Sequence, residues 1–358
     1  MIVMTFYSRD LAYPLKMIFL ISVVYCMGFI IGYAGSKRDN FQLLLKFFLW
    51  MGILISGLVL WHAFSFFIFG ELPSVPLIDY FPLPHEESLL HRAYIWYLPG
   101  ILPRFTGTLA EPNSLGIYLA FVICISLWVL AFRQRLGFDN SLFRLSIFSI
   151  LISALPLLLT FSRSGWITTI AGASIIFFMT PSRNAKWLLP LSVVVIIALT
   201  FIALTNPILL EVFLARLTIG DSMGHINVRL EALEYFKSAP ILGIGFGNYG
   251  LEVDAPLGVS STHSYYITYL VEGGILGFLV FLWFMLSLIG VYFGFSRGRI
   301  VRDPYWVLAL VLSVMVFLNN IFYHTLWLEI TWVVLGFAFA AGSIYLTNKN
   351  GVVLVRKR

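Results

Sequence analysis

Residues 113–132 read NSLGIYLAFVICISLWVLAF and contain no charged side chain. A stretch of about 20 apolar residues is long enough to cross the hydrocarbon core of a bilayer as a helix. The whole chain has the same character, because 60% of its 358 residues are hydrophobic and 11% are charged, against roughly 45–50% and 25% in soluble domains. The composition therefore predicts an integral membrane protein and excludes a cytosolic enzyme and a disordered or fibrous chain.

Similar apolar runs recur along the sequence. We count nine candidate spans, at 14–34, 42–69, 113–132, 144–161, 165–180, 187–206, 270–295, 305–323 and 325–346. They predict an all-α polytopic membrane protein that forms a single integral membrane domain over residues 1–358.

The charges between the spans predict the orientation. Of the 23 lysines and arginines, 15 fall in turns on one side of the membrane or in the C-terminal tail, whereas 14 of the 17 acidic residues fall on the other side. By the positive-inside rule the basic side is the cytoplasm. The C-terminus is then cytoplasmic, and nine crossings place the N-terminus outside. The basic excess is a topology signal, so no nucleic-acid partner is expected.

Two long segments, 70–112 and 207–263, lie on the outer face, whereas the cytoplasmic loops are short. We therefore expect the functional site on the outer face, where there is enough chain to build one. Within the second segment, Pro207 to Leu217 predicts a helix on the membrane surface, and Asn227 is expected to cap a further helix from Val228 to Ser238.

Three arginines on the outer side are candidate anion-binding residues. Arg163 lies between two spans in Ser162-Arg163-Ser164, Arg229 lies in the first turn of the predicted outer helix, and Arg216 has a weaker context. A guanidinium group binds phosphate oxygens bidentately. The alternatives are an interfacial arginine that extends to the headgroups for Arg163, and a solvated surface charge for Arg229.

His263 is the candidate acid–base residue. It immediately precedes an apolar helix at the outer surface, and an unperturbed histidine pKa near 6.5 suits proton transfer at neutral pH. An interface residue without chemistry is the alternative. His324 with Glu329, in the outer turn between the last two spans, forms a weaker pair.

Residues 243–250 read GIGFGNYG, and 245–250 fit the pattern G-x-G-x-x-G. We reject a dinucleotide site, because no strand precedes the loop and it faces away from the cytoplasm. A glycine-permitted turn and a backbone site for phosphate both remain open.

Several chemistries have no motif in this chain. We find no nucleotide-binding loop, no cysteine and histidine metal set, no serine nucleophile motif and no paired aspartates for a metal-bound sugar nucleotide. We therefore expect neither a metal nor a cofactor. Acidic residues inside the spans are nearly missing, since Glu272 and Glu329 fall near span ends, and this disfavours a proton-driven pump.

The order of the motifs resembles the O-antigen ligase and polymerase superfamily. The resemblance covers a family-like core at 107–277. It rests on Gly107-Thr108 with Pro112-Asn113-x-x-Gly116, Ser162-Arg163-Ser164, the Arg229 helix, Gly243-x-Gly245-Phe246-Gly247-Asn248, His263-Ser264 and Glu272-Gly273-Gly274-Ile275-Leu276-Gly277. Family members more often have His-Asn where this chain has His263-Ser264. They also have more spans than we count, which extends the expected number to about nine to eleven helices.

The resemblance implies a membrane glycosyltransferase of the GT-C type. Its donor would be a glycan on undecaprenyl diphosphate at the periplasmic face of the bacterial inner membrane. Arg163 and Arg229 would bind the diphosphate, and His263 would assist the acceptor. Further candidate substrate-binding residues are Arg216, Asn113, Gly245, Gly247, Ser264 and His324. Transfer would be metal-independent and would invert the anomeric centre.

Three functions remain open. A polymerase would extend the glycan on a second lipid-linked repeat unit, a reading that the compact 207–263 segment favours slightly. A ligase would deliver the glycan to lipid A core or to a protein. A lipid-linked glycan flippase is compatible with the span count. Expected partners are the donor, the glycan acceptor, membrane lipids and, for a polymerase, a chain-length-regulating membrane protein.

Overall fold

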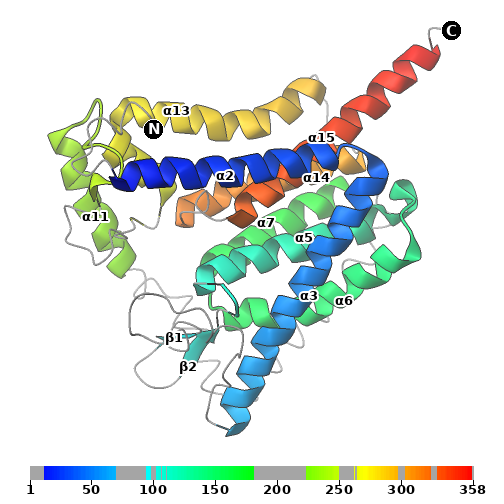
Figure 1. The fold of residues 1–358 in the computed structure, drawn as a ribbon, viewed down its shortest axis with the longest axis horizontal. Coiled ribbons are helices and arrows are strands. Elements are labelled where there is room, and N and C mark those ends of the chain that lie inside the picture. Colours follow the sequence, from blue (N-terminus) through cyan, green and yellow to red (C-terminus); the bar gives the residue numbers. More distant parts are fainter. Residues whose placement is uncertain are drawn as a thin grey trace. The chain divides into compact units, whose positions relative to one another are not determined.

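The computed structural model describes residues 12–69, 94–97, 102–105, 107–109, 111–180, 223–249, 262, 264–296, 303–323 and 329–356. Helices dominate this part of the chain (Figure 1). They are α2 (Ala12–Ala34), α3 (Arg38–Phe69), α5 (Pro112–Leu136), α6 (Asn140–Leu159), α7 (Arg163–Met179), α11 (Met223–Ser238), α13 (Tyr265–Ser296), α14 (Pro304–Phe322) and α15 (Glu329–Arg356).

The described residues form two compact units. We call residues 38–217 the central unit, and residues 1–37 with 218–358 the terminal unit. The central unit also contains an antiparallel hairpin of β1 (Tyr94–Tyr97) and β2 (Leu102–Phe105).

Six helices among the described residues are long and apolar enough to cross a membrane. They are Arg38–Phe69, Pro112–Leu136, Asn140–Leu159, Tyr265–Gly290, Pro304–Phe322 and Ile330–Asn348. The prediction of an all-α polytopic membrane protein is confirmed. The predicted spans 14–34 and 165–180 coincide with α2 and α7, whereas 187–206 lies outside the described residues, so the total of nine to eleven spans stays a prediction.

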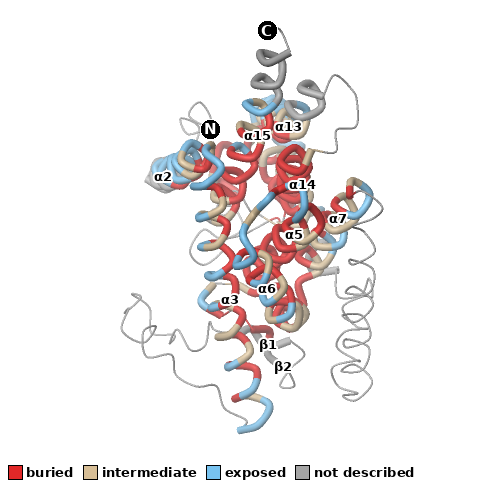
Figure 2. The backbone as a smooth tube through the Cα atoms, turned by 90° about the vertical axis from the view of Figure 1, so that its right-hand side faces the viewer, coloured by how far each residue is buried: buried red, intermediate tan, exposed pale blue. Residues whose placement is uncertain are grey.

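Helix α5 is the core of the central unit. Its side chains are apolar on every face, and a helix of that kind is buried by its neighbours. Figure 2 shows it buried along nearly its whole length, with α6, α7 and α3 packed around it. On α3 a Cβ atom on Gly52 would lie 2.8 Å from Val122 of α5, so glycine permits this close packing. The hydroxyl groups of Ser56 and Ser153, 2.9 Å apart, join α3 to α6.

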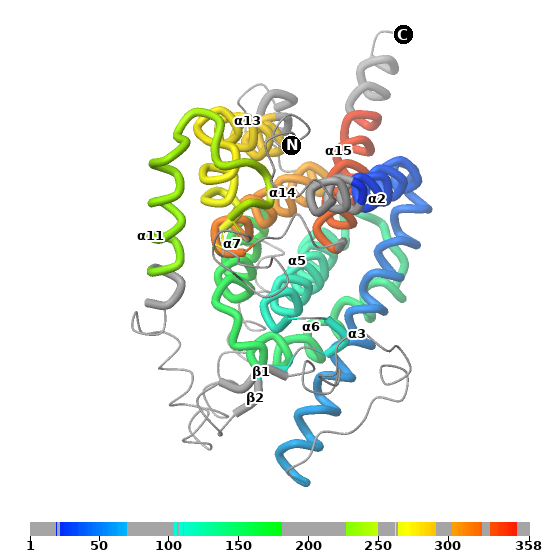
Figure 3. Tube along the Cα trace, turned by 60° about the vertical axis from the view of Figure 1, so that its left-hand side comes forward, coloured from blue at the N-terminus to red at the C-terminus, as the bar shows by residue number. Residues whose placement is uncertain are grey.

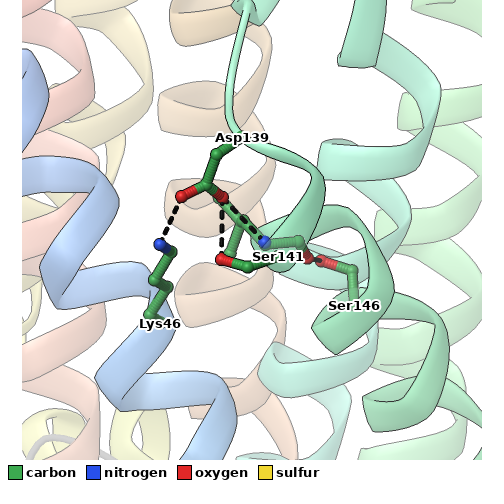
Figure 4. A network of polar contacts seen from close by, with 5 residues as sticks. Lys46, Asp139, Ser141 and Ser146 are labelled. Carbon is green, nitrogen blue, oxygen red and sulfur yellow. Dashed lines mark hydrogen bonds and ion pairs between the residues drawn. The ribbon is translucent and has the colours of Figure 1, made fainter.

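Charged contacts tie the helices at the end predicted to be cytoplasmic. Asp139 caps α6 by accepting the N–H of Leu142 at 2.9 Å, and it also pairs with Lys46 of α3 at 2.5 Å (Figure 4). The contact with Lys46, followed by that with Leu142, lowers the pKa of Asp139 to about 2. Arg38 donates to the carbonyl of Leu136, the last residue of α5. These contacts hold α3, α5 and α6 in register.

Glycines bring α2 and α15 together in the terminal unit. A Cβ atom on Gly28 would lie 2.5 Å from the carbonyl oxygen of Trp332, and one on Gly336 would lie 2.5 Å from that of Gly28. Small residues at such positions let membrane helices approach closely. Helix α15 also packs on α14, which packs on α13.

Helix α13 is broken at Gly274, which has φ 61° and ψ −167°. The rings of Tyr269 and Phe281 stack with centroids 4.3 Å apart. Twelve residues would separate them by about 18 Å in a straight helix. The piece before Gly274 therefore folds back against the piece after it, and residues 275–296 are the part that can span the bilayer, close to the predicted 270–295.

One helix boundary was predicted wrongly. Helix α11 begins at Met223, so Asn227 lies inside the helix and does not cap it. Asparagine is a common cap, but it also occurs within helices at a modest energetic cost, so the residue type alone does not place the helix start. The end at Ser238, before Pro240, is as predicted. The predicted helix at 207–217 lies outside the described residues.

We expect Gly28→Val and Gly336→Val to destabilise the folded protein by about 1–3 kcal/mol each, because the new side chain has no room between α2 and α15. Thermal unfolding of the detergent-solubilised chain measures this. Gly57→Val in α3 is the matched control, since a Cβ atom there meets nothing within 4 Å. Equal melting temperatures for Gly28→Val and Gly57→Val would contradict the packing argument.

Candidate active site

The turn between α6 and α7 presents Arg163 as the first residue of α7. Ser162 caps this helix, and its Oγ accepts the N–H of Gly165 at 3.3 Å and lies 3.0 Å from the Oγ of Ser164. The two serines therefore fix the helix start on either side of the arginine. Before them, Phe161 has φ 50°, the only positive φ at a non-glycine residue in the described part of the chain. Such strained residues often occur at functional sites.

The starts of α5 and α7 touch through two glycines. A Cβ atom on Gly165 would lie 2.8 Å from the carbonyl of Gly116, and one on Gly116 would lie 2.6 Å from the Cβ of Ser162. Helix N-termini carry a partial positive charge and attract anions. Arg163 is thus placed beside two helix starts whose electrostatics favour an anionic ligand.

Arg104 in β2 ties this junction together. It is buried, and it donates from Nε to the carbonyl of Thr160 and from Nη2 to Oδ1 of Asn113, both at 2.9 Å. The bonds link the hairpin to the start of α5 and to the residue before the strained Phe161. Sequence reasoning did not select Arg104 as a site residue. The available signal was its position three residues before the Gly107-Thr108 motif.

In the terminal unit, Arg229 of α11 is held by two carbonyl groups. Its Nε donates to Thr262 and its Nη2 to Ile321, both at 3.3 Å. Ile321 lies in the last turn of α14, where carbonyls lack helical partners and a cation is stabilising. Partial burial lowers the pKa of Arg229 from its ordinary value. An arginine nonetheless stays charged at neutral pH, so this half-buried group remains a cation.

Hydroxyl groups fix the residues on both sides of His263. Thr262 donates from Oγ1 to the carbonyl of Ser264 at 2.7 Å, and the Oγ1 of Thr262 also lies 2.9 Å from the Oγ1 of Thr268. Ser264 donates its N–H back to Oγ1 of Thr262 at 3.3 Å. All three residues are buried. His263 itself lies outside the described residues, but its two neighbours are held, and one of them accepts the Arg229 contact.

The glycine loop is a tight turn, as one of the two open predictions had it. Gly243, Gly245 and Gly247 have φ of 74°, 98° and 81°, a region that favours glycine. The loop packs against the break in α13, and a Cβ atom on Gly243 would lie 2.3 Å from the carbonyl of Glu272.

The structure therefore brings some predicted site residues together. Asn113 and Ser162-Arg163-Ser164 meet at one junction of the central unit. Arg229 and Ser264 belong to one network of the terminal unit through Thr262. Gly245 and Gly247 lie in a loop bonded to the same α11, since Tyr249 donates to the carbonyl of Val228 at 3.2 Å. Figure 3 shows α11 beside α13 in this unit. Arg216 and His324 lie outside the described residues. Over the described residues, no group of three or more metal-ligating side chains occurs.

We expect Arg104→Lys to destabilise the protein by about 2–3 kcal/mol, because one ammonium group cannot reach both partners and a buried acceptor loses its donor. Thermal unfolding of the purified protein measures the loss. Arg135→Lys, an exposed change near the end of α5, should leave the melting temperature unchanged. An unchanged melting temperature for Arg104→Lys would refute this role.

Comparison with known protein families matches residues 148–282 to a family described as O-antigen ligase. The matched segment contains Arg163, Arg229, the glycine loop and His263-Ser264, whereas Arg104 and Asn113 precede it. No curated protein and no solved structure matches the chain. The family match agrees with the motif order, and over residues 148–282 it supports the resemblance of this chain to the O-antigen ligase and polymerase superfamily.

Proposed function

We propose that this protein is a membrane glycosyltransferase that takes a glycan from undecaprenyl diphosphate at the periplasmic face of the bacterial inner membrane. The observation that carries the proposal is that the matched segment holds two arginines at helix ends. Arg163 is the first residue of α7, directly after the Ser162 cap, and Arg229 donates to a carbonyl in the last turn of α14. The C-terminus is cytoplasmic in this proposal, as the positive-inside rule predicts.

The chemistry needs charge stabilisation more than a strong acid, because a lipid diphosphate is already a good leaving group. Negative charge grows on the departing diphosphate, and cations placed there in advance lower the barrier. Arg163 and Arg229 would supply that charge without a metal ion. In-line attack by the acceptor hydroxyl, opposite the leaving group, would invert the anomeric centre.

His263 would take the proton from the acceptor hydroxyl. A positioned general base contributes roughly 10²–10⁴-fold to the rate. The contacts of Thr262 and Ser264 support this assignment, because they fix the backbone before and after the histidine. The contact from Arg229 to Thr262 also couples the proposed base to a proposed diphosphate ligand.

The acceptor divides polymerase from ligase. We propose polymerisation of O-antigen or exopolysaccharide repeat units as the first candidate. The reason is that the outer segment 207–263 is compact in the sequence. The description of the matched family favours transfer to lipid A core as the second. A transporter of lipid-linked glycan would move its substrate without forming a glycosidic bond.

Reconstitution tests the acceptor and the metal requirement together. The purified protein in detergent, given its native lipid-diphosphate-linked repeat unit as the sole substrate with EDTA present, should produce a ladder of longer glycans on a gel. Transfer only after lipid A core is added would make the protein a ligase. Activity that EDTA abolishes would contradict metal independence, and absence of transfer to either acceptor would contradict both candidates.

Arg163→Ala and Arg229→Ala should each lower kcat by about 10²–10³-fold, the usual cost of removing one group that stabilises transition-state charge. Transfer rates measured at saturating donor test this. The controls are Lys237→Ala, an exposed cation on the same helix as Arg229, and Arg135→Ala in the central unit. Normal polymer length in folded Arg163→Ala or Arg229→Ala protein would exclude that arginine from diphosphate binding.

A further inference from the structure

The loop at 243–249 has the glycine spacing of a phosphate-binding loop, but its backbone N–H groups are directed into the protein. A loop that cradles an anion does so with N–H groups that have no partner inside the chain. Here the first three N–H groups of the loop are donated to carbonyl oxygens of Ala239, Val271 and Glu272, at 2.9 to 3.1 Å. Asn248 donates to the carbonyl of Gly245 at 3.3 Å.

The side chain of Glu272 accepts hydrogen bonds from two further N–H groups of the same loop. Its carboxyl group accepts the backbone N–H groups of Gly247 and Tyr249. Only 5% of the residue is exposed, and it lies two residues before the break at Gly274. These two N–H groups therefore bond to a carboxyl group of the protein, whereas the N–H groups of a phosphate-binding loop bond to a phosphate.

The break in α13 exposes backbone groups on both of its sides, and these groups bond to the loop and to the residues just before it. Ile275 and Leu276 begin the second piece of the helix, and they donate to the carbonyls of Pro240 and Ile241 at 2.9 and 3.3 Å. A Cβ atom on Gly274 would lie 2.3 Å from the carbonyl oxygen of Ile241. The loop and the broken helix thus form one hydrogen-bonded body with Glu272 at its centre.

This body extends to the helix that carries Arg229. The buried Tyr249 donates to the carbonyl of Val228, the residue before Arg229, at 3.2 Å. Its ring also packs edge-on against Tyr235 with centroids 5.8 Å apart, and it shares a buried cluster with Ala232 of the same helix. The contacts run without interruption from Glu272 through Tyr249 to α11.

We infer that Glu272 is a positioning residue: its carboxyl group holds the glycine loop in place of a substrate phosphate, and the loop sets the position of α11 and Arg229. In this inference Gly245 and Gly247 provide the backbone conformation of the loop and do not bind the substrate. The hydrogen-bonding part of the inference depends only on the contacts above, whereas its consequence for the substrate rests on the proposed diphosphate role of Arg229.

Hydrogen exchange measured by mass spectrometry on the full-length protein tests the first part. The amides of 243–249 should be protected in the unaltered protein, and Glu272→Gln should accelerate exchange at Gly247 and Tyr249 by about tenfold or more, because an amide group turns a donor toward one of the two N–H groups. Glu234→Gln is the matched control, an exposed acid on α11 that pairs with Lys237. Unprotected amides in the unaltered protein, or unchanged protection in folded Glu272→Gln, would overturn the inference.

Binding of farnesyl diphosphate, a short prenyl diphosphate, tests the second part. The inference predicts about tenfold weaker binding by Glu272→Gln, because misplaced binding groups are costly. If the loop instead bound phosphate, removal of the competing carboxyl group would leave binding unchanged or tighten it, and that result would overturn the inference. If Glu272→Gln does not fold, Glu272→Asp replaces it, with faster exchange and weaker binding again expected. Absence of binding by the unaltered protein would refute the proposed function, while the exchange data would still decide the role of Glu272.

Discussion

Every backbone N–H and C=O group that leaves water must find a partner within the protein, and this demand is most severe in apolar surroundings. An uninterrupted helix meets it internally. An interrupted helix leaves backbone groups without helical partners. In the described part of this chain, hydrogen bonds from other segments supply partners at two such interruptions. Loop 243–249 donates hydrogen bonds to the carbonyls just before the break in α13. At the strained turn between α6 and α7, Arg104 donates a hydrogen bond to the carbonyl of Thr160. Three of the motifs that carry the family resemblance lie at these two places, namely Ser162-Arg163-Ser164, the glycine loop and the segment 272–277.

The same demand explains why an arginine bonds to a helix end in each unit, Arg104 to the end of α6 and Arg229 to the end of α14. A guanidinium group carries five N–H donors in a rigid fork, so it can complete a helix end and still attract an anion through its charge. Arg229 bonds to Thr262 and to Ile321, which belong to different segments, and it therefore has a structural part as well as its proposed chemical one. Loss of activity in an alanine variant of Arg229 is informative only when folding is measured alongside it. A lysine variant separates the two parts, because it keeps the charge and loses the fork.

Local signals in the sequence predicted much of the fold. The run at 113–132 is apolar on every face, and it became the buried core helix α5 with bounds within a few residues of those expected. Hydropathy did not reveal the break at Gly274, because a left-handed backbone leaves no trace in hydropathy. Arg104 was missed for a different reason. Its partners Asn113 and Thr160 lie up to 56 positions away in the sequence, and only the fold brings them together.

The contacts of Glu272 indicate a different role from the one that its residue type and position would indicate. An acidic side chain within an apolar helix ordinarily indicates an ion or proton path. Sequence reasoning placed Glu272 near a span end and gave it no role. Its carboxyl group instead accepts two backbone N–H groups of a loop that the broken helix needs for its own hydrogen bonds. A buried polar group whose partners are supplied inside the protein needs no translocated ion to account for it. The one buried acid in the described part of the chain therefore gives no support to a transport function, and its contacts belong to the network that holds Arg229.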